Sequence, residues 1–253
     1  MKTRTFLEIC NNVAIELRFE KFVSVVSNED KNAEFVGLMV QQGIERDVAS
    51  YHPWASLRRQ AGVPFSAGRD IYGLPDDFDY IINNTAWDTV KQAPAEGPMD
   101  PVDWSALKGS TSLASSIRTI TFTILGGTNA VGALQPGNVQ QMAVLPVPAQ
   151  ATSGPAITYM YVSEDRVLDA SGKLKPWFTD DADIPLFDAD LVELAGLVRA
   201  LRSLGLRFAD QMDELQAKLK SEARRDGGRR TATVAGHVGK VLMSSTPGHT
   251  RVR

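Results

Sequence analysis

The sequence predicts an α+β fold that is mainly helical, with four main helices, a small antiparallel β insertion and an extended C-terminal tail. In four stretches, apolar residues recur every three or four positions, which indicates helices with one buried face. Apolar and polar residues alternate in the middle of the chain, at about residues 116–163, which indicates strands. Residues 226–253 hold few large apolar side chains, and such a segment does not offset its own ordering entropy. We therefore expect a folded region, 1–225, followed by a tail, 226–253.

The first two helices are expected at residues 5–20 and 29–51. Asn28 can begin the second helix, and Glu29 and Asp30 lie in its first turn, where acidic side chains complement the helix dipole. The expected buried faces are Phe6, Ile9, Cys10, Val13 and Leu17 in the first helix, and Ala33, Val36, Val40, Ile44 and Val48 in the second.

The third and fourth helices are expected at residues 188–204 and 206–225. Gly205 separates them, and Gly227 follows the second of the two, as is typical of a helix end. Their expected buried faces are Leu191, Leu194, Ala195, Val198 and Leu201, and then Phe208, Met212, Leu215 and Leu219.

Turn residues divide the middle of the chain into short pieces. Residues 57–72, with three Gly or Pro residues, are consistent with a β-hairpin. Asp100 or Asp103 could cap a short helix that ends near Gly109. Residues 129–138, rich in Gly, Ala and Pro, indicate a loop. The expected strands of the β insertion are 116–125, whose apolar face is Ile120, Phe122 and Ile124, then 140–147 and 157–162.

Composition and charge bound the class of protein. The chain has 253 residues, 43% hydrophobic and 23% charged, which is ordinary for a soluble globular protein. A net charge of −3 argues against nucleic-acid binding by the molecule as a whole. From Arg224 onward, however, the sequence contains seven basic residues and one acidic residue. This part therefore has a net charge of +6, and the rest of the chain has a net charge of −9. We find no apolar run of membrane-spanning length and no signal-peptide pattern, and expect a soluble protein made inside the cell.

The reactive side chains of the sequence form no recognisable catalytic arrangement, which predicts a protein without catalysis. Cys10 is the single cysteine, so an internal disulfide and a cysteine metal cluster are excluded, and its place on a helix stripe favours a buried structural thiol. The three histidines share no metal-binding spacing. Five aspartates between Asp180 and Asp190 could suggest calcium, but helix capping and dipole complementation explain them better. We predict no catalytic, cofactor-binding or metal-ligating residues.

The stretch from Tyr72 to Asp88 combines many turn-forming residues. Proline at position 75 excludes a helix there, and Asn83-Asn84 favours a turn. Trp87 can anchor that turn. Its three aspartates, at positions 76, 77 and 79, could form a carboxylate pair, but the polar surroundings favour solvated or turn-forming carboxylates. We interpret the stretch as a rigid platform.

The basic tail has two functional interpretations beside that of a solvated segment. It could bind DNA through phosphates, or it could dock in a groove of a protein partner. Its basic residues alternate with apolar ones, whereas a phosphate binder needs charge alone, and this favours a protein partner. The residues concerned are Arg224, Arg225, Arg229, Arg230, Val234, Val238, Lys240, Val241, Leu242, Met243, Arg251 and Arg253.

The order of several motifs resembles a known family. Two N-terminal helices precede Trp54, and the run Tyr-Gly-Leu-Pro-Asp-Asp-Phe-Asp starts at Tyr72. Asn-Asn-Thr-Ala-Trp-Asp starts at Asn83, Gly-Pro-Met-Asp-Pro-Val-Asp-Trp at Gly97, and Trp-Phe-Thr-Asp-Asp at Trp177. Over roughly residues 1–110 and 160–225, the chain resembles the head-to-tail adaptor (connector) proteins of tailed bacteriophages, which form rings between portal and tail.

This resemblance implies a helical bundle with a small β insertion, so that residues 1–225 form the adaptor domain. It implies a homo-oligomeric ring of twelve subunits in the neck of the virion, made in the host cytoplasm, whose lumen conducts DNA without specific binding. It implies no catalysis, no cofactor and no membrane contact. The expected partners are the portal protein, which the tail residues named above would bind, and a tail or nozzle protein.

The expected subunit interface lies in the platform and in the short helix that follows it. The candidates are Leu74, Pro75, Phe78, Trp87 and Trp104. The acidic body agrees with a channel that must not retain DNA, because basic walls would hold phosphates. The alternative function is a small nucleic-acid-binding accessory protein that uses the same basic tail.

Overall fold

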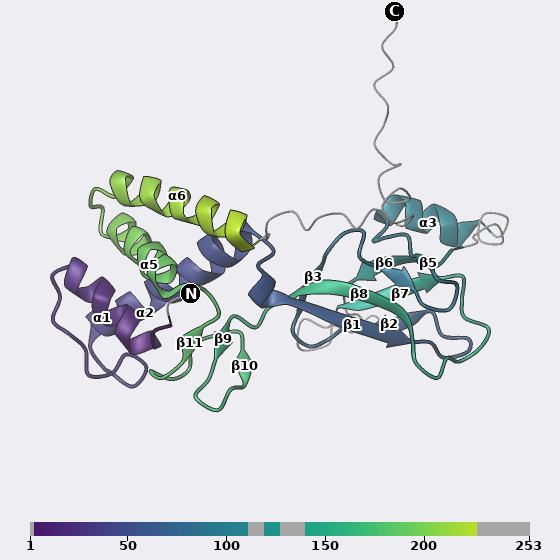
Figure 1. Ribbon diagram of the computed structural model, residues 1–253, viewed down its shortest axis with the longest axis horizontal. Helices are drawn as coiled ribbons and strands as arrows, with labels where there is room; N and C mark the ends of the chain where they lie inside the picture. The colour runs from purple at the N-terminus through teal and green to yellow at the C-terminus, as the bar shows by residue number, and fades with distance from the viewer. Residues whose placement is uncertain (1–2, 111–118, 127–139, 227–253) are drawn as a thin grey trace, which may run out of the picture.

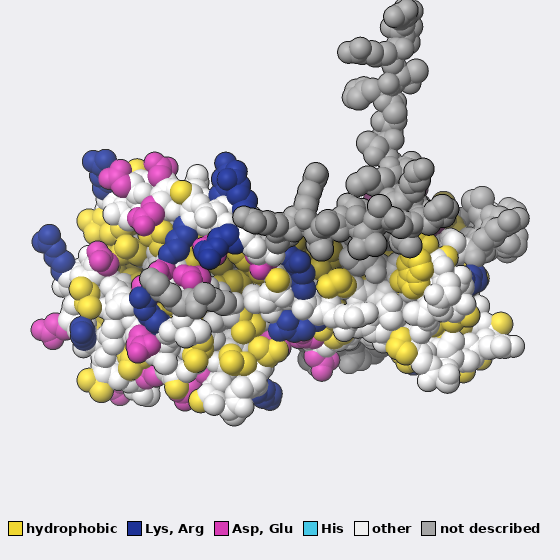
Figure 2. Space-filling model, viewed as in Figure 1, with side chains coloured by type: hydrophobic (Ala, Val, Ile, Leu, Met, Phe, Trp, Pro, Cys, Tyr) yellow, Lys and Arg dark blue, Asp and Glu magenta, His cyan; other side chains and the backbone are white. Residues whose placement is uncertain are grey.

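The computed structural model describes residues 3–110, 119–126 and 140–226, and these residues form two lobes side by side (Figure 1). One lobe holds four helices and a small sheet, and the other holds two sheets and one short helix. Each lobe has its own hydrophobic core. On the face shown in Figure 2, charged side chains gather mainly on the helical lobe.

The helical lobe confirms all four main helices expected from the sequence. They are α1 (Phe6–Glu16), α2 (Lys31–Gly43), α5 (Ala189–Ser203) and α6 (Ala209–Asp226). After α2 the chain continues through a π turn, Ile44–Val48, and a 3-10 turn, Ala49–Tyr51, so the expected helical stretch ends where predicted. All five residues of the second predicted stripe are buried, and Cys10 is fully buried in α1. Burial raises the pKa of the Cys10 thiol, which keeps it protonated.

Two glycines bring α2 and α5 into close contact. A Cβ atom added at Gly43 would lie 2.9 Å from the backbone nitrogen of Gly196, and one at Gly196 would lie 2.8 Å from a methyl carbon of Val40. Both distances are shorter than van der Waals contact between the two atoms concerned. The small residues therefore set the separation of the two helices at the centre of this lobe.

The β lobe is built around one long antiparallel pair. Strand β1 (Arg58–Pro64) pairs with β8 (Pro155–Ser163), with Arg58 opposite Val162 and Val63 opposite Ile157. Three short strands, β3 (Phe78–Ile81), β4 (Trp87–Asp88) and β5 (Ala93–Pro94), complete this five-stranded sheet.

A second sheet packs into the same lobe, in the order β2, β7 and β6. Its strands are β2 (Ile71–Gly73), β6 (Thr121–Leu125) and β7 (Gln141–Leu145). The side chains of Phe122 and Met142 are fully buried in its core. Helix α3 (Pro101–Gly109) contributes Trp104, which packs with Leu145.

A third sheet lies beside the helices. It consists of β9 (Val167–Leu168), β10 (Leu174–Lys175) and β11 (Ile184–Pro185), with β9 in the middle. Val167 belongs to the same core as the helices, so this sheet is part of the helical lobe.

The prediction of a mainly helical bundle with a small β insertion is wrong. Within the described residues there are eleven strands in three antiparallel sheets, and six of them lie outside both the predicted insertion at about 116–163 and the predicted hairpin at 57–72. Several of these strands are two to four residues long, too short for alternation to reveal them. Turn residues around it also obscured β3, which has four residues.

The predicted hairpin at residues 57–72 is also wrong. Strands β1 and β2 both lie in this stretch, but β1 pairs with β8 and β2 pairs with β7. Glycine and proline marked the turn between two strands correctly, whereas their partners are more than 60 residues away, beyond the reach of a local pattern.

The prediction that Asn28 begins the second helix is wrong, because Asp30 caps α2 by accepting a hydrogen bond from the backbone nitrogen of Asn32 at 2.9 Å.

Other local predictions are confirmed. The Asp100 side chain accepts a hydrogen bond from the backbone nitrogen of Val102 at 2.8 Å and caps α3, which ends at Gly109. Asn84 has a φ angle of 61°, as expected for the predicted turn. Strands at 121–125, 141–145 and 155–163 agree with the three predicted ones, whereas residues 116–118 and the loop at 129–138 lie outside the described residues.

None of the helices in the described ranges is long and apolar enough to cross a membrane.

Replacing Gly43 by Ala should destabilise the helical lobe. The added methyl group meets the backbone of α5, which cannot rotate away as a side chain can. Overpacking of this kind costs about 1–3 kcal/mol, measurable as a lower free energy of unfolding in urea. Gly109→Ala is the matched control, since a Cβ atom there has nothing within 4 Å. An equal stability of Gly43→Ala and wild type would show that the helices can separate freely.

Candidate functional site

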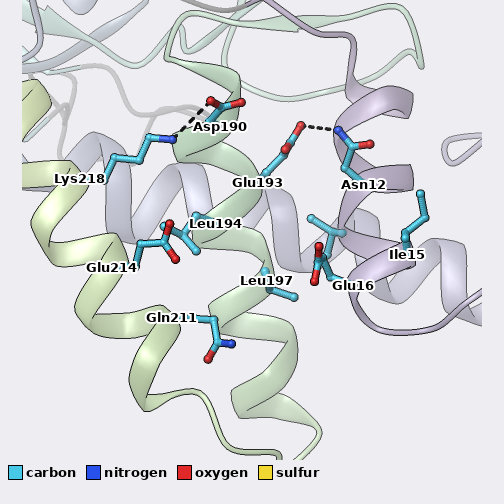
Figure 3. Close-up of a pocket in the computed structure, with 11 residues that line it drawn as sticks. Asn12, Ile15, Glu16, Asp190, Glu193, Leu194, Leu197, Gln211, Glu214 and Lys218 are labelled. Carbon is cyan, nitrogen blue, oxygen red and sulfur yellow. Dashed lines mark hydrogen bonds and ion pairs between the residues drawn. The ribbon is translucent and has the colours of Figure 1, made fainter.

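A groove of about 540 Å³ opens between α1, α5 and α6 and is the best candidate for a binding site (Figure 3). It combines apolar and acidic side chains from α1 with those of α5 and α6, which lie more than 170 residues further along the chain. Its lining residues are Asn12, Val13, Ile15, Glu16, Asp190, Glu193, Leu194, Leu197, Gln211, Glu214 and Lys218.

Helix capping places the polar groups at one end of this groove. The Thr5 hydroxyl accepts a hydrogen bond from the backbone nitrogen of Glu8, and the Glu8 carboxylate accepts one from that of Thr5. This capping box begins α1 and leaves Arg4 just ahead of it. Asp188 caps α5 by accepting from the backbone nitrogen of Asp190, which puts Asp190 in the first turn.

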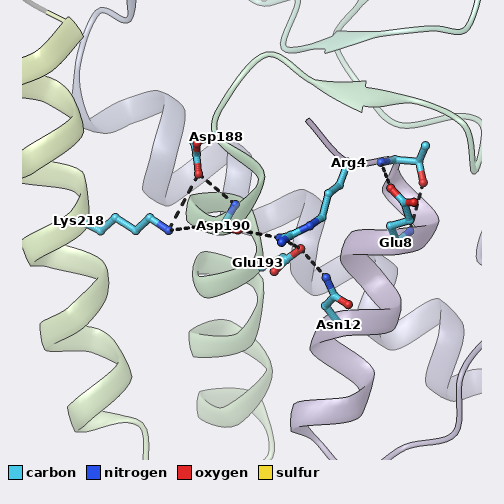
Figure 4. Close-up of polar contacts among 8 residues, drawn as sticks. Arg4, Glu8, Asn12, Asp188, Asp190, Glu193 and Lys218 are labelled. Carbon is cyan, nitrogen blue, oxygen red and sulfur yellow. Dashed lines mark hydrogen bonds and ion pairs between the residues drawn. The ribbon is translucent and has the colours of Figure 1, made fainter. Parts of the chain in front are cut away.

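Four charged side chains and one amide form a continuous network there (Figure 4). Arg4 Nη1 lies 2.7 Å from Asp190 Oδ1 and 2.6 Å from Glu193 Oε1, and Asn12 Nδ2 donates to Glu193 Oε1 at 2.8 Å. Lys218 Nζ lies 3.7 Å from Asp190 Oδ2. The hydrogen bond to Glu193 raises the pKa of Arg4. The network joins the start of α1 to α5 and α6.

The other end of the groove is also acidic, but no basic side chain of the described residues pairs with its carboxylates. Glu16 of α1 and Glu214 of α6 are exposed, and neither forms a hydrogen bond or ion pair with another residue of the described ranges. Between them lie the half-buried Leu194 and Leu197 of α5, and Ile15 at the edge is 48% exposed. A groove with these properties can hold a segment that offers cations and apolar side chains together.

The tail begins at the junction of the two lobes. Helix α6 extends through Asp226, one residue beyond the predicted end. The carboxylate oxygen Oδ2 of Asp226 accepts hydrogen bonds from the backbone nitrogen of Ala55 at 2.8 Å and from Arg58 Nη2 at 3.0 Å. His52 Nε2 lies 3.3 Å from the same oxygen. These contacts fix the position from which the tail continues.

Only two of the twelve predicted tail residues lie in the described ranges. Arg224 and Arg225 are exposed on the last turn of α6, and Arg225 Nη1 lies 2.8 Å from Glu222 Oε1. The remaining predicted residues lie outside the described ranges: Arg229, Arg230, Val234, Val238, Lys240, Val241, Leu242, Met243, Arg251 and Arg253.

The predicted subunit-interface residues divide into buried and accessible ones. Leu74 and Phe78 are buried in the core of the β lobe, and Trp104 is buried under α3. Pro75 is partly accessible, and Trp87 is 40% exposed on β4. The structure therefore leaves Trp87 as the accessible large side chain of the set, and its role in an interface stays a prediction.

The three aspartates of the predicted platform, expected to be solvated or turn-forming, differ in their surroundings. Asp77 accepts hydrogen bonds from the hydroxyls of Tyr161, at 2.9 Å, and Ser163, at 2.6 Å. These contacts anchor the turn before β3 to strand β8. Burial raises the pKa of Asp79, against a smaller lowering effect of Arg166. Asp76 is exposed, as predicted.

The aspartates between 180 and 190 stabilise backbone turns. Asp188 caps α5, as the sequence predicts. Asp183 is buried, accepts from the backbone nitrogens of Thr179 and Asp180, and pairs with Lys175 at 2.7 Å. In the ranges that the structure describes, no group of three or more His, Cys, Asp or Glu side chains could hold a metal ion.

Sequence reasoning missed the groove itself. Its acidic and apolar residues lie on three helices, and only their packing brings them together. A usable signal existed in α5, where Asp190, Glu193 and Leu197 follow at spacings of three and four and therefore share one face.

No protein-family model matches this chain, and no curated protein sequence is significantly similar to it.

Replacing Asp79 by Asn should stabilise the protein at neutral pH. Because burial raises the folded-state pKa of Asp79, its charge costs stability once the pH rises above the unfolded value of about 3.9. The free energy of unfolding should therefore increase in the variant at pH 7. At pH 3 the carboxyl is protonated in both states, and the effect should vanish. The matched control is Asp76→Asn, an exposed neighbour, for which no change is expected. A loss of stability at pH 7 would mean that the attraction of Arg166 outweighs desolvation.

Proposed function

We propose that this chain is a structural protein of a bacteriophage particle, a head-to-tail adaptor. In this role it forms a ring beneath the portal, connects the capsid to the tail and provides a channel for DNA. The observation that carries the proposal is a set of accessible large apolar side chains on one face of the five-stranded sheet. This face is formed in large part by residues 72–88, the stretch with the most specific resemblance to the adaptor family.

The geometry of that face supports a contact with a neighbouring subunit. Tyr80 of β3 pairs with Val162 of β8, and Trp87 of β4 pairs with Thr158. Side chains alternate along a strand, so Tyr80, Met160 and Trp87 share one side of the sheet. They are 43%, 38% and 40% exposed. An accessible cluster of two aromatic residues and a methionine has the composition of a protein-binding surface.

The charge distribution also supports an assembly role. The body of the chain is acidic and repels the DNA that a channel must release, whereas the basic tail can attach to another protein. Arg224 and Arg225 begin this basic region on the exposed end of α6. The tail starts from a fixed point, since Asp226 is held by Ala55 and Arg58.

Replacing Trp87 by Ala should impair ring formation more than folding. The side chain is 40% exposed on a two-residue strand, so the free energy of unfolding should fall by no more than about 1 kcal/mol. Ring formation with the portal should be lost in negative-stain images. Trp177→Ala, which removes an equally exposed tryptophan from the helical lobe, is the matched control and should keep the ring. Unfolding of Trp87→Ala would place this residue in the core and remove the interface.

Deleting residues 227–253 should abolish co-sedimentation with the portal and leave the fold intact. The deletion keeps Asp226 and its contacts with Ala55 and Arg58, so circular dichroism and the melting temperature should not change. Binding of the portal at full strength would exclude the tail as the attachment segment. Loss of salt-dependent DNA retention in a gel shift, with portal binding unaffected, would favour a nucleic-acid-binding accessory protein.

A further inference from the structure

We infer that the groove between α1, α5 and α6 binds residues 240–243 of its own chain. This inference goes beyond the proposed function, because it requires neither a portal nor a ring. The segment reads Lys-Val-Leu-Met and is the most apolar part of the tail. The groove offers the complementary surface: two leucines in its floor and, on opposite walls, the carboxylates of Glu16 and Glu214, which have no ion-pair partner among the described residues.

The apolar parts match in size and place. Leu194 and Leu197 lie on successive turns of α5, half-buried, with Ile15 of α1 exposed at the edge. Val241, Leu242 and Met243 could cover these side chains. Three consecutive large apolar residues occur nowhere else in residues 227–253. Burying them against the floor removes apolar surface from water on both partners, at about 25 cal/mol per Å².

The charges match as well. The groove is lined by four acidic residues and one lysine, whereas residues 227–253 contain five Lys and Arg residues and no acid. At one end, Arg4 and Lys218 already neutralise Asp190 and Glu193. At the other end, Glu16 and Glu214 lie on opposite walls (Figure 3). Lys240 directly precedes the apolar residues and can supply the missing cation between them.

The chain is long enough for this contact. Gln211, at the far end of the groove, lies 15 residues before Asp226 on the same helix, or about 22 Å at 1.5 Å per residue. The 13 residues between Asp226 and Lys240 span up to about 45 Å when extended. A tethered segment also has a local concentration on the order of 1 mM. Docking within one chain is therefore favoured over docking on a second copy in dilute solution.

Because of this contact, the groove would compete with any external partner for binding of the tail. A protein that binds residues 240–243 must first displace them from Leu194 and Leu197. The same step would expose Glu16 and Glu214, so that release of the tail is coupled to a change on the surface of the helical lobe.

A nitroxide spin label on Ser244→Cys tests the inference in the full-length chain. Cys10 is fully buried and does not take up the label. The label should broaden the backbone amide signals of Glu16, Leu197 and Glu214, and leave those of α3 sharp. Glu214→Lys should remove the broadening. Asp213→Lys, the same charge change at an exposed position outside the groove, should retain it. The charge exchange Glu214→Lys with Lys240→Glu should restore it.

Two results would overturn the inference. Sharp signals along the groove in the labelled wild type, or broadening that Glu214→Lys leaves unchanged, would show that the segment does not bind there. In a mixture of isotope-labelled and spin-labelled chains, broadening would assign the segment to a second copy and exclude docking within one chain. All these measurements are made without portal protein, so their outcome does not depend on whether the adaptor proposal is correct.

Discussion

The antiparallel pairing of β1 with β8 is the interaction on which the rest of the structure depends. At one end of this pair, Val162 lies in the core of the helical lobe, and at the other end Val63 and Ile157 lie in the core of the β lobe. The continuous backbone ladder therefore fixes the two lobes relative to each other. Strands β3 and β4 also pair with β8, so the accessible face with Tyr80 and Trp87 exists only because this ladder forms.

Charged side chains hold the helical lobe together, and their sign distinguishes the acidic body of the chain from its basic tail. Arg4, Asp190 and Lys218 tie three helices together at one end of the groove, while the carboxylates of Glu16 and Glu214 at the other end form no ion pair within the part of the chain that the structure describes. At the junction of the lobes, Asp226 accepts a hydrogen bond from Arg58, and this contact joins the end of α6 to the start of β1. A basic tail that leaves this point has an acidic surface of its own chain within reach.

Local patterns predicted the helices well and the sheets poorly, for a physical reason. A helix satisfies its hydrogen bonds within a few residues, so the stripe from Ala33 to Val48 was enough to locate α2. A strand needs a partner that the sequence does not name. Strands such as β4 and β5 contain two residues each and exist only because β8 and β4 offer them hydrogen bonds. The size of the β lobe therefore escaped prediction.

The sequence by itself determined four helices, the Asp188 cap of α5, the buried thiol of Cys10 and the opposite charges of body and tail, because each depends on neighbouring residues or on composition. Only the tertiary structure decided which candidates are accessible, since it buried Leu74, Phe78 and Trp104 and left Trp87 at the surface. It also created the groove, whose walls come from residues about 200 positions apart that meet through the packing of α1, α5 and α6. Surfaces made by long-range packing cannot be read from local patterns.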